Sequence, residues 1–98
     1  MSETPRMNLY LLTQNENRRY DTFVACVVVA PDEDTARGIH PRGSLKADLE
    51  RDCWVGHHHG FYDSRDWARK PSGVTVRLLG VAEESYATSV ICSSFNAG

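Results

Sequence analysis

The sequence predicts an α+β domain in which a small, mainly antiparallel sheet of about four strands carries one or two short helices on one face. Apolar runs of strand length come in two pairs, one before residue 31 and one after residue 73, and a proline-led acidic stretch follows the first pair. Strands grouped in this way, instead of alternating with helices, are typical of antiparallel sheets. With 98 residues, 41% hydrophobic and 24% charged, the chain has an ordinary globular composition and enough length for one core.

A single domain is expected over residues 7–98, preceded by a flexible tail. Residues 1–6 are polar and contain a proline, which favours fraying, and Met7 would make an equally good start. The first strand is expected around the apolar run 9–12, which a turn-rich cluster ends. The second strand covers residues 22–30, where apolar residues fill both alternating positions, as in a strand that is covered on both sides or central in its sheet. The simplest pairing of these two strands is a hairpin.

A short helix is expected after the second strand. Pro31 is tolerated in a first helical turn, and the acidic residues 32–34 complement the positive end of the helix dipole. Gly38 weakens the helix and Pro41 forbids its continuation, so His40 should lie at or just past the end.

The rest of the predicted scaffold is a second short helix and two further strands. The helix is expected over residues 44–52, because Leu45 and Leu49 stand four residues apart and a serine at the start can cap it. Residues 74–81 alternate well enough for a third strand, after a turn-forming Lys-Pro-Ser-Gly sequence. Residues 89–95 are expected to form the fourth.

Charge and motifs argue against several classes of protein. A net charge of −2 gives no basic field for a dedicated nucleic-acid binder. No apolar run reaches the roughly 18 to 20 residues of a membrane span, and residues 1–6 lack the order of a signal peptide, so a cytoplasmic protein without a membrane partner is expected. Three cysteines, an odd number, are expected to be reduced thiols. We find no nucleophile elbow and no phosphate loop, so neither enzymatic activity nor a cofactor is expected.

The 42–72 segment is the part of the chain that points to binding. Its residues 53–67 hold both tryptophans, three of the four histidines and two further aromatic rings, with no helix or strand period. Trp, Tyr and Arg most often dominate the energy of binding interfaces, so this segment is predicted to contact a partner. The predicted contact residues are Trp54, Phe61, Tyr62, Arg65 and Trp67. In the alternative interpretation, at least one tryptophan folds back over the helix-free side of the sheet to complete a small core.

The same segment allows two further interpretations. Cys53, His57 and His59 are candidate zinc ligands, because thiolate and imidazole suit zinc and a Cys-x3-His spacing can reach one ion. A closed site needs four ligands, however, and no second paired motif supplies the fourth, so a solvated loop is the simpler interpretation. Residues 42–70 contain six cations against five anions, so direct nucleic-acid binding, which needs a positive groove beside aromatic rings, is not expected. A zinc-stabilised or nucleic-acid-contacting small regulatory domain is the alternative function that these two interpretations leave open.

Several landmarks of the chain resemble a group of small phage and prophage proteins that usually carry no assigned activity. The matching stretches are residues 8–14, 20–21, 30–37, 39–41, 74–76, 79–80 and 94–98. The resemblance covers most of the chain outside residues 42–66, which depart from the shorter members, and its motifs imply no active site. It implies a phage-encoded accessory protein in the bacterial host cell, of which host-defence inhibitors such as anti-CRISPR proteins are one kind. The implied partner is a host protein or a protein–RNA defence complex, and exposed strand edges also make a homodimer possible.

Overall fold

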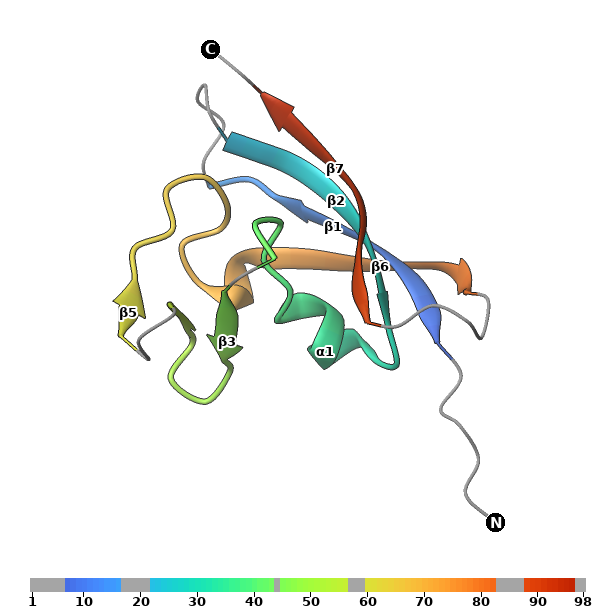
Figure 1. Ribbon diagram of the computed structural model, residues 1–98, viewed down its shortest axis with the longest axis horizontal. Helices are drawn as coiled ribbons and strands as arrows, with labels where there is room; N and C mark the ends of the chain where they lie inside the picture. The colour runs from blue at the N-terminus through green and yellow to red at the C-terminus, as the bar shows by residue number, and fades with distance from the viewer. Residues whose placement is uncertain (1–6, 17–21, 44, 57–59, 83–87, 97–98) are drawn as a thin grey trace.

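The computed structural model describes residues 7–16, 22–43, 45–56, 60–82 and 88–96. Its main body is an antiparallel sheet of four strands in the order β6-β1-β2-β7 (Figure 1). The strands are β1 Asn8–Gln14, β2 Thr22–Ala30, β6 Val74–Val81 and β7 Ser89–Asn96. The four predicted strands, their antiparallel arrangement and the hairpin of the first two are confirmed.

One face of this sheet carries the core. Alternate residues of the two central strands, among them Leu12 and Val28, point to this face and are fully buried. Val29 is also fully buried, although successive strand residues face opposite sides. This part of β2 is therefore covered on both faces and central in its sheet, as predicted. Val27 faces the same side as Val29 but is only half-buried.

The single α-helix in the described part of the chain is α1, Glu33–Arg37. It begins where predicted, because the side chain of Asp32 accepts a hydrogen bond from the backbone N–H of Thr35 (2.7 Å) and caps the helix. This hydrogen bonding lowers the pKa of Asp32. Gly38 ends the helix, and His40 lies just past its end, as predicted. The helix packs on β6, β1 and β2.

The predicted helix over residues 44–52 is wrong. The chain instead forms a second antiparallel sheet in the order β3-β4-β5. Its strands are β3 Lys46–Asp48, β4 Cys53–Val55 and β5 Phe61–Tyr62, and a 3-10 turn, η1 Pro71–Gly73, then leads into β6. Two features stop a helix here: the side chain of Asp48 accepts a hydrogen bond from the backbone N–H of Arg51 (3.0 Å), and Asp52 has a φ of 55°. Both belong to a tight turn between β3 and β4.

Burial of one tryptophan explains why strand pairing is preferred over helix. Ala47 on β3 lies opposite Trp54 on β4, and the Trp54 side chain is fully buried. A helix would have placed Leu45 and Leu49 on one buried face, yet Leu49 is 46% exposed in the structure. A spacing of four between two leucines is therefore outweighed by the larger area that the indole ring buries.

Within the described residues, no helix has both the length and the apolar character that crossing a membrane requires. The three cysteines are free thiols, with Cys26 in the core and Cys92 exposed. Burial, and secondarily the nearby Cys92, raises the pKa of Cys26 to about 12.

Candidate functional site

The structure places both tryptophans of the predicted contact surface in the core. Trp54 and Trp67 are fully buried, and the ring N–H of Trp54 donates to the backbone oxygen of Ala68 (2.8 Å). Their rings are therefore not available to a partner in this conformation. The alternative interpretation, in which tryptophans complete a small core, is correct for both of them. The predicted side is wrong, because both rings belong to the same core cluster as Ala36 of α1 and so do not lie on a helix-free side of the sheet.

A buried histidine lies next to Trp54 and fixes the 42–72 segment on the sheet. His40 is fully buried, and its ring meets the rings of Trp54 and Tyr62 edge to face, at centroid distances of 5.0 and 5.9 Å. Its Nδ1 accepts a hydrogen bond from the backbone N–H of Arg42 (3.2 Å), so the neutral ring carries its proton on Nε2. That proton is donated to the Oγ of Ser64 (3.1 Å).

Asp66 completes this arrangement, which we call the His40 network: His40, Arg42, Ser64 and Asp66. The Nε of Arg42 pairs with Oδ2 of the buried Asp66 carboxylate, and this contact raises the pKa of Arg42. The other carboxylate oxygen lies 3.6 Å from His40 Nε2 and has no hydrogen-bond partner among the described residues. The backbone of Asp66 also accepts a hydrogen bond from the N–H of Phe23 on β2 (2.6 Å). The network therefore ties the segment to the end of α1 and to the large sheet.

Burial controls the charge of this network. Desolvation lowers the pKa of His40 to about 4, against the opposing effect of the Asp66 carboxylate and with a smaller contribution from Arg42. The imidazole is therefore neutral near pH 7. The buried Asp66 carboxylate has its counter-ion in Arg42.

The residue types Ser, His and Asp invite comparison with a catalytic triad, but their geometry differs from one. In a triad, the aspartate orients one ring nitrogen while the serine uses the other. Here Ser64 and Asp66 both approach Nε2 of His40, and a backbone N–H occupies Nδ1. Ser64 and His40 are also almost fully buried. This arrangement holds chain segments together and presents no nucleophile to a substrate.

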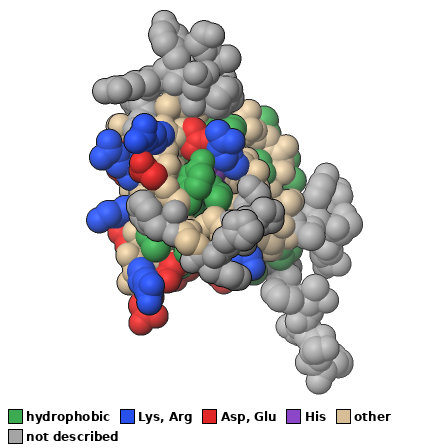
Figure 2. All heavy atoms as spheres, turned by 60° about the vertical axis from the view of Figure 1, so that its left-hand side comes forward, with side chains coloured by type: hydrophobic (Ala, Val, Ile, Leu, Met, Phe, Trp, Pro, Cys, Tyr) green, Lys and Arg blue, Asp and Glu red, His purple; other side chains and the backbone are tan. Residues whose placement is uncertain are grey.

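Two of the predicted contact residues remain at the surface. Arg65 is highly exposed, with its Nε 3.1 Å from the Asp63 carboxylate, and Tyr62 is half-buried on β5. Phe61 belongs to β5, but its side chain lies outside the described part of the structure. Figure 2 shows this side of the molecule, with a small group of hydrophobic side chains near its centre and Lys, Arg, Asp and Glu above and to the left of it. An apolar centre with a polar rim is the usual anatomy of a protein interface.

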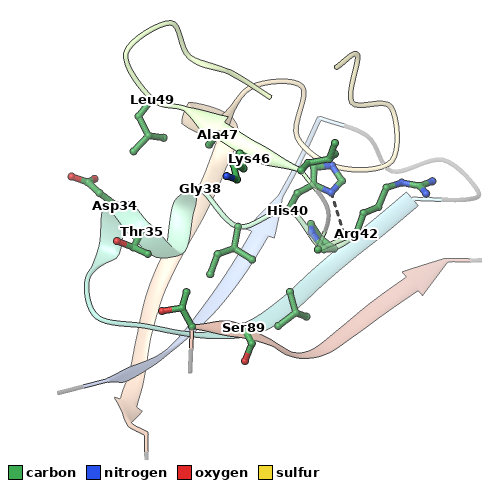
Figure 3. A pocket seen from close by; sticks show the side chains of 15 residues that line it. Asp34, Thr35, Gly38, His40, Arg42, Lys46, Ala47, Leu49 and Ser89 are labelled. Carbon is green, nitrogen blue, oxygen red and sulfur yellow. Dashed lines mark hydrogen bonds between the residues drawn. The ribbon is translucent and has the colours of Figure 1, made fainter. Parts of the chain in front are cut away.

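A groove that no sequence signal indicated lies next to His40, whose ring contacts Tyr62. It has a volume of about 770 Å³ and lies between α1, the chain that follows it, β3 and the start of β7 (Figure 3). Ile39, Ala47 and Val90 line it with apolar side chains, and Lys46 and Asp34 carry charges on it. The groove exists because α1 packs on the other three strands of the large sheet and leaves the start of β7 uncovered.

A glycine and the His40 network shape one wall of the groove. A Cβ atom on Gly38 would come within 3.3 Å of the Cβ of Ala47, so glycine allows β3 to lie close to the end of the helix. His40 and Arg42 also line the groove, so the network that fixes the 42–72 segment fixes this wall as well. The only signal in the sequence for the change of chain direction after α1 was the pair Gly38 and Pro41, which end the helix.

The zinc hypothesis falls mostly on residues that the structure does not describe. Cys53 is half-buried on β4, whereas His57 and His59 lie outside the described residues. Within the described ranges, no group of three His, Cys, Asp or Glu side chains is placed to hold a metal ion. The hypothesis therefore stays a prediction to be tested by experiment.

The surface of Tyr62 and Arg65 and the adjacent groove form the candidate functional site. Lys46 on its rim has no ion-pair partner among the described residues, whereas Arg42 is paired with Asp66. An unpaired cation beside an apolar floor gives the site both a hydrophobic and an electrostatic means of recognition. Comparison with protein-family models, curated proteins and solved structures finds no match to this chain.

Proposed function

We propose that this protein is a non-enzymatic binding module that attaches to a host protein or protein–RNA complex through Tyr62, Arg65 and the groove beside them. The observation that carries the proposal is the groove, which has apolar side chains and charges of both signs, and one wall of which is held by the buried His40 network. Together with the resemblance to phage accessory proteins, this supports a stoichiometric inhibitor of a bacterial defence complex of the CRISPR type, acting in the cytoplasm of the host cell.

The chemistry of the surface favours a protein contact over a bare nucleic-acid strand. Single-stranded nucleic acids bind in positive grooves with stacked aromatic rings. In this groove, Asp34 stands at one end, Arg42 is already neutralised by Asp66, and both tryptophans are buried. An apolar floor with charges of both signs on the rim suits a protein surface.

Co-purification from a lysate of the bacterial host tests the proposal, followed by titration of the captured complex with variants of this protein. Tyr62→Ala or Arg65→Ala should weaken binding roughly thirtyfold, or by about 2 kcal/mol, because buried Tyr and Arg side chains dominate interface energy. Lys46→Glu should weaken binding to an acidic partner surface while leaving the melting temperature unchanged, since Lys46 is exposed and forms no ion pair with the residues that the structure describes.

Arg51→Ala is the matched control for Arg65→Ala. Both arginines are highly exposed and both pair with an aspartate in the same segment, and neither lines the groove. They differ in position, because Arg51 lies in the turn between β3 and β4, whereas Arg65 follows β5 and Tyr62. It should bind like the wild type. If Tyr62→Ala, Arg65→Ala and Lys46→Glu all fold and bind at wild-type strength, this surface is not the interface.

Inhibition itself is measured in a bacterial strain whose CRISPR-type defence destroys an incoming phage. Expression of the protein should restore phage growth, and purified protein should stop the purified defence complex at a molar ratio near one. Binding without inhibition would support the binding function and contradict the proposed role as an inhibitor.

A further inference from the structure

The free end of β6 exposes three large apolar side chains. Leu78, Leu79 and Val81 are 60%, 50% and 59% exposed. They lie on an edge strand, because β6 pairs with β1 on one side and has no strand on the other side within the described residues. Figure 1 shows that this end of β6 extends past α1, so the helix does not cover it.

The sequence of β6 lacks most of the features that normally keep an edge strand from pairing. Soluble proteins protect such edges with lysine, proline, inward-pointing charges or β-bulges, and of these β6 has only a bulge. The eight residues of β6 contain no proline, no lysine and no acidic residue, and Arg77 is the single charge. A β-bulge lies in the pairing of Leu9 and Tyr10 with β6, and bulges re-aim the side chains beside them. Two consecutive leucines are exposed at this bulge.

We propose that β6 pairs with β6 of a second copy of this chain, so that two four-stranded sheets join into one across a twofold axis. An antiparallel pair with its axis between Leu78 and Leu79 places these two leucines opposite each other and Val76 opposite Val81. Arg77 then lies opposite Gly80, so the two like charges do not face each other.

Self-complementarity is the reason to choose a second copy over another partner. A twofold interface joins the same patch on both subunits. On both sides of the axis between Leu78 and Leu79 the strand is mainly apolar, and its single charge, Arg77, does not face the Arg77 of the other copy. One strand pair buries less than the roughly 1,200 Å² of a stable interface, so the dimer should be weak and concentration-dependent. The candidate functional site is formed by other elements and stays open in this dimer.

Sedimentation velocity of the full chain, from about 10 µM to about 1 mM, tests the dimer. The wild-type mass should rise from the monomer value of 11.0 kDa towards twice that value. Leu79→Lys should raise the dimer dissociation constant at least tenfold, or about 1.4 kcal/mol, because a lysine on an edge opposes pairing. Val81→Lys is a second variant at an equally exposed position, should the first fail to fold.

Ile91→Lys is the matched control. It introduces the same charge at an apolar residue that is 46% exposed, on the opposite edge strand β7. It should dimerise like the wild type. A wild-type mass that stays at 11.0 kDa throughout overturns the proposal. An Ile91→Lys variant that becomes monomeric while Leu79→Lys remains dimeric also overturns it, because the interface would then lie at β7.

The dimer is independent of the proposed function, and the variants separate the two. Monomeric Leu79→Lys should still capture the host partner as well as wild type does. If the protein dimerises but binds no host complex, the proposed binding function is wrong, and the β6 interface is still supported.

Discussion

The two sheets of this protein are built at very different scales. Strands of the larger sheet have seven to nine residues, whereas those of the smaller sheet have two or three. The larger sheet is held by long ladders and by apolar side chains packed on its face. The smaller sheet is held by a buried tryptophan and by the His40 network.

This difference shows how a few residues without regular periodicity acquire a defined position. A sheet of strands this short is marginal on its own, so it depends on contacts to the rest of the molecule. Trp54 supplies apolar contact, and Asp66 supplies hydrogen bonds and an ion pair that reach back to β2 and Arg42. The smaller sheet therefore forms a wall of the groove only while these contacts hold.

Breaking the larger sheet should have the largest effect. Val28→Asp places a charge without a counter-ion at a fully buried position of the core, and we expect a loss of about 5 kcal/mol or insoluble protein. Denaturant unfolding of the soluble fraction measures it. Val27→Asp is the control, since this neighbour faces the other side and is only half-buried, and it should cost clearly less. Equal losses at the two positions would contradict the register of β2.

Breaking the smaller sheet should cost less and act more locally. Trp54→Ala removes a fully buried ring and its hydrogen bond to Ala68, which should cost about 3 kcal/mol. Hydrogen exchange should accelerate most in β3, β4 and β5, because the ladders of the larger sheet are untouched. Uniform acceleration across both sheets would mean that they unfold as a single unit.

Trp67→Ala should lower both the stability of the protein and its affinity for the partner, whereas Arg65→Ala should lower the affinity alone.

The sequence predicts the larger sheet well because its signals are local. Apolar runs mark the four strands, and Asp32 and Gly38 mark the ends of the helix. The smaller sheet could not be predicted from periodicity, since strands of two or three residues have none. One local signal was available: Gly56 and Gly60 bracket the histidines between apolar pairs, and the N–H of Gly56 bonds the oxygen of Gly60 (2.9 Å), as in a hairpin.

The candidate site was only half predictable for a related reason. The aromatic composition of the 42–72 segment drew attention to part of the candidate site, but composition does not distinguish a buried ring from an exposed one. Trp54 and Trp67 are buried by contacts to residues far away in the sequence, whereas Tyr62 and Arg65, the other two predicted contact residues whose side chains the structure describes, remain at the surface. The groove depends on the position of β7 beside β3, a long-range relation that no local motif reports.

Low pH should destabilise the smaller sheet by protonating the His40 network, and this effect should distinguish it further from the larger sheet. The pKa of His40 in the folded protein is about 4, below its ordinary value of 6.5, so the folded state resists taking up a proton. Stability should therefore be complete above pH 6.5 and fall as the pH drops from 6.5 to 4, by roughly 3 kcal/mol. Comparing the unfolding free energy of wild type and His40→Gln over this range isolates the effect. If the unfolding free energies of the two proteins change with pH in the same way, protonation of His40 does not affect stability.

Removal of the histidine triplet should have the smallest effect. The smaller sheet is already fastened by Trp54 and the His40 network, and a closed zinc site needs a fourth ligand beyond Cys53, His57 and His59. Replacing residues 57–59 with serine should therefore shift the melting temperature by no more than about 1 to 2 °C, and a chelator should leave the wild type unchanged. Elemental analysis of the purified protein is the independent check. Stoichiometric zinc, together with unfolding by the chelator, would show that a metal ion, and not the buried network alone, holds the smaller sheet in place.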